Sequence, residues 1–278
     1  MRNGLSKSRY LALVLVMMLG FSLFGCSAPA ATTTEAVAAP SATGAAFNAD
    51  PKEEYYMVTF LSGIEYWKGC YKGFEAAGEL YGVKTIYAGA AEYDVNQAVT
   101  VFEQIIANKP AGIAVTCINP DAYVEPIKKA MEAGIPVVTF DADSPNSGRY
   151  SFLATGNKAA GAMAANYLAS ALGEKGDVAL VTLPGQLNHE ERTAGFVETI
   201  EAKYPNMKVV QVANGGGEQT TAAAAASGIL QANPSVVGLF CTDATSGVGA
   251  VAAIAETNRT DVKIVSFDTD KGTLDAIK

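Results

Sequence analysis

The chain has 278 residues, of which 49% are hydrophobic and 17% are charged. This composition is typical of a globular protein and excludes intrinsically disordered proteins, which have few apolar residues and a high net charge. Acidic residues outnumber basic residues by 28 to 20, so the chain has no basic excess with which to neutralise phosphates, and no nucleic-acid partner is expected. The length predicts two lobes or one large α/β unit, because a single hydrophobic core rarely extends over a chain of this size.

Residues 1–25 have the pattern of a secretory signal peptide. The basic residues Arg2, Lys7 and Arg9 precede an apolar stretch over residues 10–24, which ends at a small residue. That stretch is shorter than the roughly 20 apolar residues of a membrane-spanning helix, and no later segment is long and apolar enough to span a bilayer. The sequence therefore predicts export of the chain from the cytoplasm.

The segment Leu23-Phe24-Gly25-Cys26 resembles the lipobox of bacterial lipoproteins. In such proteins cleavage leaves the cysteine as a lipidated N-terminus, whereas the alternative is an incidental thiol in a discarded peptide. Residues 26–51 are rich in Ala, Thr, Ser and Pro and are expected to form a flexible tether. We expect a folded part that is held outside the bacterial cell membrane by an N-terminal lipid such as palmitate.

From residue 55 onward, short β-rich runs alternate with longer helical patterns. Repeated βα units of this kind predict parallel sheets that helices cover on both faces. The predicted strands cover residues 55–61, 84–88, 112–116, 136–140, 150–154, 177–183, 208–213, 236–240 and 262–267. The predicted helices cover residues 66–81, 95–108, 122–133, 158–172, 190–204, 220–232 and 248–257.

Residues that follow the predicted strands are candidate ligand contacts, because open α/β sheets bind their ligands at the carboxyl ends of the strands. Aromatic rings, carboxylates, amides and one arginine are found there. A sugar suits this set, since its C–H faces stack on aromatic rings and its hydroxyls pair with carboxylates, Arg and amides. The candidates are Tyr66, Trp67, Thr116, Asn119, Asp141, Asp143, Arg192, Asp243 and Asp268.

Cysteine and histidine are too sparse to predict a metal site. Cys70, Cys117 and Cys241 are widely spaced and are expected to be small buried hydrophobic residues. The single histidine, His189, is expected in an exposed loop. The chain also lacks the Gly-x-Ser-x-Gly segment of a serine hydrolase, so no cofactor, metal or catalytic residue is expected.

Short motifs recur in a characteristic order from residue 54 to the end of the chain. They are Tyr66-Trp67, Asn119-Pro120-Asp121-Ala122, Gly134-Ile135-Pro136-Val137-Val138-Thr139-Phe140-Asp141, Thr155-Gly156-Asn157 with Gly161, Arg192-Thr193-Ala194-Gly195-Phe196, Asp243 with Gly249-Ala250, and Ser266-Phe267-Asp268. Their order and spacing resemble those of the type I periplasmic binding proteins. The most similar members of this family are the ribose-, galactose- and xylose-type sugar receptors of ABC importers.

The resemblance implies an α/β fold of two doubly wound parallel-sheet lobes that close on a ligand about a hinge. Residues 52–156 together with 267–278 would form the N-terminal lobe, and residues 157–266 the C-terminal lobe. The implied function is that of a non-enzymatic solute receptor, expected to be monomeric, which binds a monosaccharide or polyol and presents it to an ABC permease. A receptor for a sugar-like signal such as an autoinducer and an extracytoplasmic α/β enzyme stay open as alternatives.

Positions in the motifs also imply roles for individual side chains. Tyr66 and Trp67 would sandwich the sugar ring. Asp141 and Arg192 would bind hydroxyls in a bidentate manner. Asp243 and Asp268 would be further ligand contacts, and Thr116 or Asn119 would lie at the edge of the binding site.

The sequence departs from the family pattern in three places. Ala142 stands where ribose receptors often have Arg, which points to a sugar other than ribose, and Asp243 stands where Asn is frequent. The chain also stops at Lys278, inside a predicted helix, whereas the family continues through a third crossing strand. The sequence therefore resembles a C-terminally truncated copy that lacks the last crossover.

Overall fold

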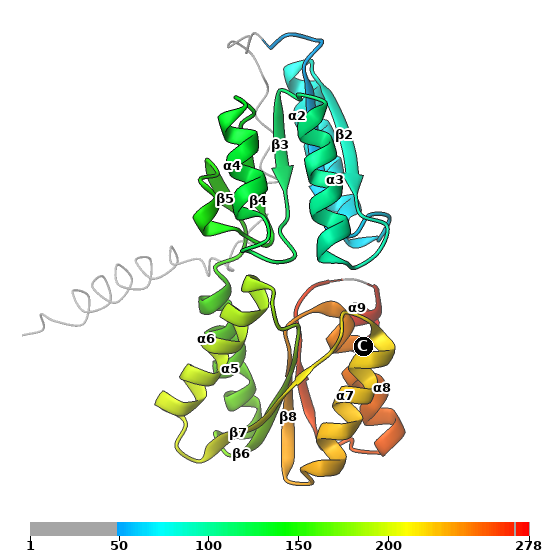
Figure 1. Ribbon diagram of the computed structural model, residues 1–278. Coiled ribbons are helices and arrows are strands. Elements are labelled where there is room, and N and C mark those ends of the chain that lie inside the picture. The colour runs from blue at the N-terminus through cyan, green and yellow to red at the C-terminus, as the bar shows by residue number, and fades with distance from the viewer. Residues whose placement is uncertain (1–48, 270, 278) are drawn as a thin grey trace, which may run out of the picture. The chain divides into compact units, whose positions relative to one another are not determined.

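The computed structural model describes residues 49–269 and 271–277 (Figure 1). The signal peptide, Cys26 and most of the proposed tether lie outside the described residues. Within them, strands and helices alternate, and every strand and helix predicted from the sequence overlaps an observed element. No described helix is both long enough and apolar enough to cross a membrane.

The first half of the described chain forms a parallel sheet of five strands in the order β2-β1-β3-β4-β5. We call this sheet and its helices the N-terminal lobe. Its strands are β1 (Glu54–Thr59), β2 (Lys84–Gly89), β3 (Gly112–Val115), β4 (Val137–Phe140) and β5 (Ser151–Leu153). Its helices are α2 (Tyr66–Tyr81), α3 (Val95–Ala107) and α4 (Val124–Glu132), with a short 3₁₀ turn, η1, at Pro145–Ser147.

The second half forms a parallel sheet of four strands in the order β7-β6-β8-β9. We call this sheet and its helices the C-terminal lobe. Its strands are β6 (Gly176–Thr182), β7 (Met207–Asn214), β8 (Val236–Cys241) and β9 (Lys263–Val265). Its helices are α5 (Asn157–Leu172), α6 (Leu187–Lys203), α7 (Gln219–Ala232), α8 (Ala244–Thr257) and α9 (Lys271–Ile277).

Both sheets reverse their direction of growth once. The chain moves outward from β1 to β2 and then returns past β1 to β3, and the step from β6 to β7 and back to β8 repeats this path. Because βα crossovers are right-handed, the reversal places the helices before it and the helices after it on opposite faces of the sheet. In the C-terminal lobe α5 and α6 accordingly pack together on one face, and α7 and α8 on the other (Figure 1).

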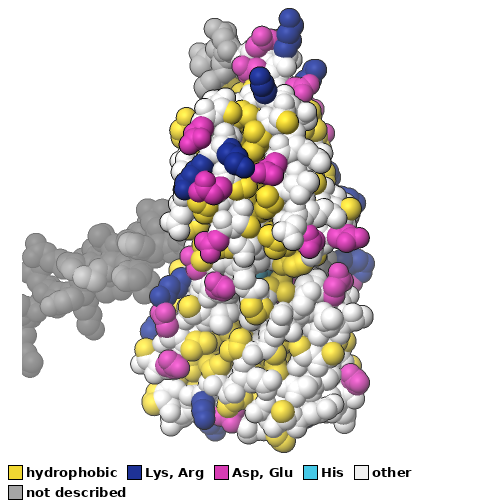
Figure 2. Space-filling model, viewed as in Figure 1, with side chains coloured by type: hydrophobic (Ala, Val, Ile, Leu, Met, Phe, Trp, Pro, Cys, Tyr) yellow, Lys and Arg dark blue, Asp and Glu magenta, His cyan; other side chains and the backbone are white. Residues whose placement is uncertain are grey.

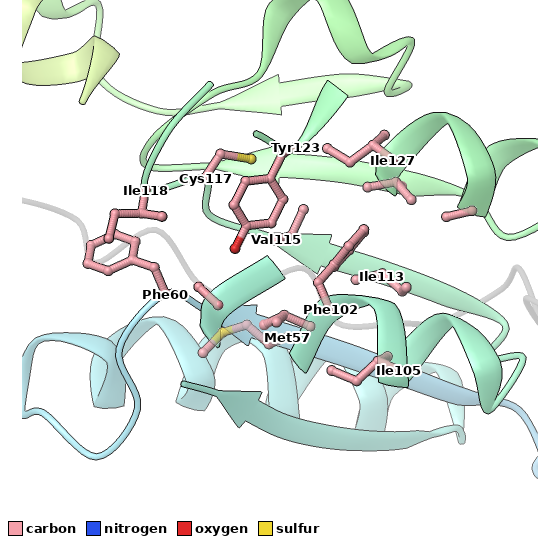
Figure 3. Close-up of a cluster of buried hydrophobic side chains, with 14 of the residues drawn as sticks. Met57, Phe60, Phe102, Ile105, Ile113, Val115, Cys117, Ile118, Tyr123 and Ile127 are labelled. Carbon is pink, nitrogen blue, oxygen red and sulfur yellow. The ribbon is translucent and has the colours of Figure 1, made fainter. Parts of the chain in front are cut away.

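Each lobe has its own hydrophobic core. In the N-terminal lobe one buried cluster includes Met57, Phe102 and Tyr123 (Figure 3). In the C-terminal lobe β6 is apolar on both faces, since Val178 and Leu180 belong to the cluster beneath α5 and α6, whereas Ala179 and Val181 belong to the cluster beneath α7 and α8. This burial on both faces is the pattern expected of a parallel strand.

Two expectations about elements and cysteines differ from the structure. The sequence assigns residues 267–278 to the N-terminal lobe, but α9 packs against α8 in the C-terminal lobe. Cys117 and Cys241 are buried as predicted, whereas Cys70 is exposed on α2. The prediction for Cys70 was wrong because a helical pattern alone does not show which side of the helix faces the sheet.

The visible surface carries charges of both signs in close mixture. Figure 2 shows acidic and basic side chains interspersed over the drawn face. Ion pairs between exposed side chains include Lys129–Glu103 between α4 and α3 and Lys128–Glu125 within α4. Exposed pairs of this kind contribute little to stability, about 0–1 kcal/mol each.

Candidate ligand-binding site

Two aspartates with left-handed backbones stand at the carboxyl ends of equivalent strands. Asp141 follows β4 with a φ of 61°, and Asp268 lies just beyond β9 with a φ of 71°. Asp and Asn are several-fold enriched in this backbone region relative to most other L-residues. Each aspartate directly follows a phenylalanine, Phe140 or Phe267. The two lobes thus place a carboxylate in the same way at the sheet edge where α/β proteins bind ligands.

Asp141 accepts hydrogen bonds from two hydroxyl groups. The Tyr66 hydroxyl donates to Oδ1 at 3.0 Å, and the Thr116 hydroxyl donates to Oδ2 at 3.3 Å. Burial raises the pKa of Asp141 above its ordinary value of 3.8, although the Tyr66 hydrogen bond and the positive charge of Arg192 oppose this effect. Tyr66 is 45% exposed at the start of α2, so this cluster combines a carboxylate with an accessible aromatic ring.

Charged side chains from both lobes affect the pKa of the Tyr66 hydroxyl. Its pKa is raised first by burial and then by the negative charges of Asp141 and Asp268, whereas Arg192 lowers it. The phenol is therefore neutral at physiological pH and acts as a hydrogen-bond donor. The same interactions show that Tyr66, Asp141, Asp268 and Arg192 lie near enough to influence one another electrostatically.

Arg192 is held firmly in the C-terminal lobe. It lies on α6 and is 6% exposed. Its Nε donates to Asn157 Oδ1 at 2.9 Å, and its Nη1 donates to the Thr242 carbonyl at 2.7 Å. The guanidinium carbon lies 4.0 Å from the centre of the Phe267 ring. Nη2 has no acceptor within the described part of the chain, so this nitrogen can donate to a ligand.

Asp243 caps the helix that follows β8. Its Oδ1 accepts a hydrogen bond from the Ser246 backbone at 2.9 Å, and its Oδ2 accepts one from the Ser246 hydroxyl at 2.6 Å. Asp268 Oδ2 accepts from the Ala244 backbone at 3.0 Å in the same turn of α8. Both carboxylates are thereby fixed at the start of α8, and direct contact of either with a ligand stays a prediction.

Asp143 forms an ion pair within the N-terminal lobe. Arg149 Nε donates to Asp143 Oδ1 at 2.7 Å, Arg149 Nη2 pairs with the other oxygen, and the Thr139 hydroxyl donates at 2.6 Å. Burial by itself raises the pKa of Asp143, but these hydrogen bonds outweigh it and hold the pKa below 3.8. The sequence predicts a ligand contact for Asp143, whereas the structure places its oxygens on Arg149 and Thr139.

Trp67 and Asn119 also lie differently from the positions that the sequence predicts. Trp67 is 1% exposed and packs edge-to-face against Phe60 and Phe140, with ring centres 5.5 and 5.8 Å apart. It belongs to the hydrophobic core and does not offer an open face for stacking. Asn119 Oδ1 accepts from the backbones of Asp121 and Ala122, so this side chain shapes the turn after β3.

His189 is buried near Arg192 and Asp243, although the sequence predicts an exposed loop for it. The histidine is 5% exposed within the first turn of α6, and its Nδ1 lies 2.9 Å from the Thr242 hydroxyl. Burial and the charge of Arg192 lower its pKa from 6.5 to about 4, although Asp243 opposes the shift. A helix beginning before residue 190 would have revealed it, because positions 189 and 192 then share one face.

A hydrogen bond also joins side chains of the two lobes. The amide nitrogen of Gln186, the residue that precedes α6, donates to the hydroxyl of Tyr93 in the loop after β2. Gln186 is buried and Tyr93 is exposed. The sequence did not predict this pair, because neither residue belongs to a recognisable motif.

Residues 55–278 match the family model described as the periplasmic binding protein domain. The chain belongs to this family. The match confirms the resemblance drawn from the motifs, and the two parallel sheets confirm the predicted α/β fold. Membership of the periplasmic binding proteins also implies an extracytoplasmic location.

Related periplasmic binding proteins have sugars in their names. The chain is 29% identical over 207 residues to the D-apiose import binding protein of Actinobacillus succinogenes, covering 74% of this chain and 66% of that protein. The chain thus spans just under two thirds of this curated relative.

Solved structures show the same likeness. The structure of an arabinose-binding protein from Geobacillus stearothermophilus is 54% identical, with a TM-score of 0.72 over 82% of this chain and 79% of that one. A solute-binding protein from Burkholderia graminis, solved in complex with D-arabinose, is 27% identical, with a TM-score of 0.78 over 82% and 81% of the two chains.

Proposed function

We propose that this periplasmic binding protein is the solute receptor of an ABC importer and binds a sugar or sugar-like polyol between its two lobes by hinge closure. The cluster of Tyr66, Asp141 and Arg192 carries the proposal. It combines one anionic acceptor, one neutral phenol and one cationic donor, with contributions from both lobes. The names of related proteins support a monosaccharide, since the pentoses D-apiose and arabinose and the hexose D-allose occur among them.

The chemistry of this cluster favours a neutral polyhydroxylated ligand. A sugar hydroxyl can donate to Asp141 or to the Tyr66 oxygen while it accepts from Arg192 Nη2. An anionic ligand would meet Asp141, Asp243 and Asp268 against a single Arg192, an unfavourable charge balance. Each buried polar group that a wrong epimer leaves unpaired weakens its binding, which would give selectivity between sugars.

The decisive experiment is a titration of the full chain with D-arabinose, L-arabinose, D-apiose, other pentoses, hexoses and polyols by isothermal calorimetry. We expect saturable binding of at least one monosaccharide, and a weaker interaction of about tenfold or more with Arg192→Lys, which keeps the charge but loses the planar fork. NMR of the sugar after prolonged incubation should show no product. If no sugar binds, the carbohydrate function is wrong, and if product accumulates, the chain is an enzyme.

We further propose that Cys26 carries the N-terminal lipid and that the receptor works as a monomer beside a membrane permease. Cells that express the wild type or Cys26→Ala can be labelled with a palmitate analogue and fractionated. We expect the wild type to be labelled and to sediment with membranes, whereas the variant should be unlabelled. Equal labelling of the two proteins would exclude Cys26 as the attachment site, and light scattering of the soluble domain tests the monomer.

A further inference from the structure

His189 lies beside a row of three threonine hydroxyl groups, which come from β6, from α6 and from the turn after β8. Its Nδ1 is 2.9 Å from Thr242 Oγ1, just beyond β8. Thr242 Oγ1 in turn is 3.1 Å from Thr182 Oγ1 at the end of β6, and Thr182 is 3.1 Å from Thr193 Oγ1 on α6. The imidazole therefore stands at one end of a chain of hydroxyl groups along the carboxyl edge of the C-terminal sheet.

The direction of these hydrogen bonds determines the tautomer of His189. A threonine hydroxyl carries one proton, and Thr242 Oγ1 donates it to Thr182 Oγ1. Thr242 can then only accept from the imidazole, so Nδ1 carries the ring proton and Nε2 has a free lone pair. Because the pKa of His189 is lowered to about 4 by burial and the charge of Arg192, against the opposing charge of Asp243, the ring is neutral at pH 7.

Nε2 is the open end of this otherwise buried ring. Within the part of the chain that the structure describes, no group forms a hydrogen bond with it. Fully enclosed polar atoms without a partner include Trp67 Nε1 and Tyr123 Oη, and His189 Nε2 is not among them. The small exposed fraction of His189 therefore includes Nε2, close to Arg192 and Asp243 at the edge where the proposed ligand binds.

We propose that His189 Nε2 accepts a hydrogen bond from one hydroxyl of the bound sugar and so selects for ligands that carry a hydroxyl group at that position. The inference rests on the proposed sugar-binding function and adds a specificity-determining residue to it. A neutral imidazole with a fixed tautomer can only accept at Nε2. An ether or deoxy position of a ligand would leave this lone pair buried and unpaired, which lowers affinity.

The single histidine makes a direct spectroscopic test possible. A ¹⁵N spectrum of the full chain labelled in histidine contains resonances from one imidazole only. At pH 7 without sugar, we expect a protonated Nδ1 and an unprotonated Nε2. Saturation with the sugar that binds most tightly should move the Nε2 resonance toward the hydrogen-bonded range and leave Nδ1 nearly unchanged.

Two substitutions separate ligand contact from structural support. In His189→Asn the amide reaches the position of Nδ1 and can keep the Thr242 contact, but nothing replaces Nε2. In His189→Gln the amide oxygen can reach the position of Nε2. We expect His189→Asn to weaken sugar binding about tenfold with little change in melting temperature. His189→Gln should recover part of that loss. The control Glu201→Gln, on the exposed far end of α6, should bind sugar like the wild type.

Monodeoxy derivatives of the same sugar identify the hydroxyl group. One derivative should bind the wild type about tenfold more weakly than the parent sugar, and His189→Asn should lose this discrimination. If the parent sugar binds but neither the Nε2 resonance nor the affinity of His189→Asn changes, the His189 contact is wrong while the proposed function stands. If no sugar binds the wild type at all, both proposals fail, and a proton found on Nε2 would by itself exclude an acceptor.

Discussion

Asp141 shows how backbone and side chain together define one position of the site. Its left-handed backbone restricts the position largely to Asp, Asn or Gly, since other residues cost about 1 kcal/mol or more there. Its carboxylate is held by Tyr66 and Thr116. Both constraints favour aspartate, whose carboxylate can also accept hydrogen bonds from two hydroxyl groups of a sugar.

Asp141→Asn should separate the charge of Asp141 from its conformation, because Asn also tolerates the left-handed backbone. We expect sugar affinity at pH 7 to fall between about tenfold and a hundredfold, the range for a lost hydrogen bond to a charged group. The wild type binds through the ionised carboxylate, so its affinity should fall as the pH drops through the pKa of Asp141, which burial raises above 3.8. Calorimetry across pH checks this, and an affinity of Asp141→Asn with the same acid dependence would contradict it.

Asp143→Asn should lower stability without lowering sugar affinity, because Asp143 pairs with Arg149 and Thr139. We expect a loss of about 2 kcal/mol in the free energy of unfolding near pH 7. A carboxylate with a lowered pKa stabilises the fold above 3.8 and loses this contribution as the pH falls through its folded value. The difference from the wild type, measured by urea unfolding, should therefore shrink in acid. A large loss of affinity at full stability would instead make Asp143 a ligand contact.

Ligand contact by Asp141 or Asp268 stays a prediction, but the position of each after a strand was predictable from the sequence. Trp67 was not, because residues 66 and 67 are adjacent on a helix and point about 100° apart. When Tyr66 faces the site, Trp67 turns into the core. Asp143 was predicted as a ligand contact, whereas in the structure its carboxylate pairs with Arg149. The local sequence does not show which nearby acid Arg149 contacts.

At the scale of elements, α5 and α6 approach each other closely at two glycines. A β-carbon added to Gly161 would lie 2.0 Å from the Arg192 carbonyl oxygen, and one added to Gly195 would lie 2.0 Å from the Lys158 carbonyl oxygen. This contact brings Asn157, at the start of α5, next to Arg192 on α6. The sequence predicted both helices, but not that their glycines face each other, since spacing along one helix does not show the partner surface.

Gly161→Ala should therefore force the two helices apart. We expect a loss of about 1–3 kcal/mol in the free energy of unfolding, the usual cost of overpacking, together with weaker sugar binding because Arg192 shifts. Gly228→Ala on α7 is the matched control, since its β-carbon would meet no atom within 4 Å and Ala favours the helix by up to about 1 kcal/mol. Thermal and chemical unfolding of both variants measure the difference. Equal stability would show that the helices separate at little cost.

At the scale of the whole molecule, the two lobes repeat one arrangement. Each sheet reverses its strand order once, and each has a left-handed aspartate beyond the end of a strand, Asp141 after β4 and Asp268 after β9. The sequence predicted the alternation of strands and helices well, because buried parallel strands and the residues that end the helices give clear sequence patterns. It did not predict the hydrogen bond between Gln186 and Tyr93, since contacts between lobes depend on tertiary geometry.

A sugar that contacts both lobes should raise the stability of the protein and also make the protein more compact. At a concentration of 100 times its Kd, linkage predicts about 2.7 kcal/mol of added stability. We expect a higher Tm and a smaller radius of gyration by X-ray scattering, whereas a non-binding epimer should change neither quantity. An increase in Tm without compaction would show binding without hinge closure.

Cys70 gives the protein a practical use as an optical sensor. It is exposed on α2, one helical turn after Tyr66, and partial burial of the thiol together with the charge of Asp141 raises its pKa. The other two described thiols are buried. In a version that lacks Cys26, a maleimide dye would therefore attach selectively at Cys70, beside the proposed ligand site. The occupancy of that site could then be followed as a change in the fluorescence of the attached dye.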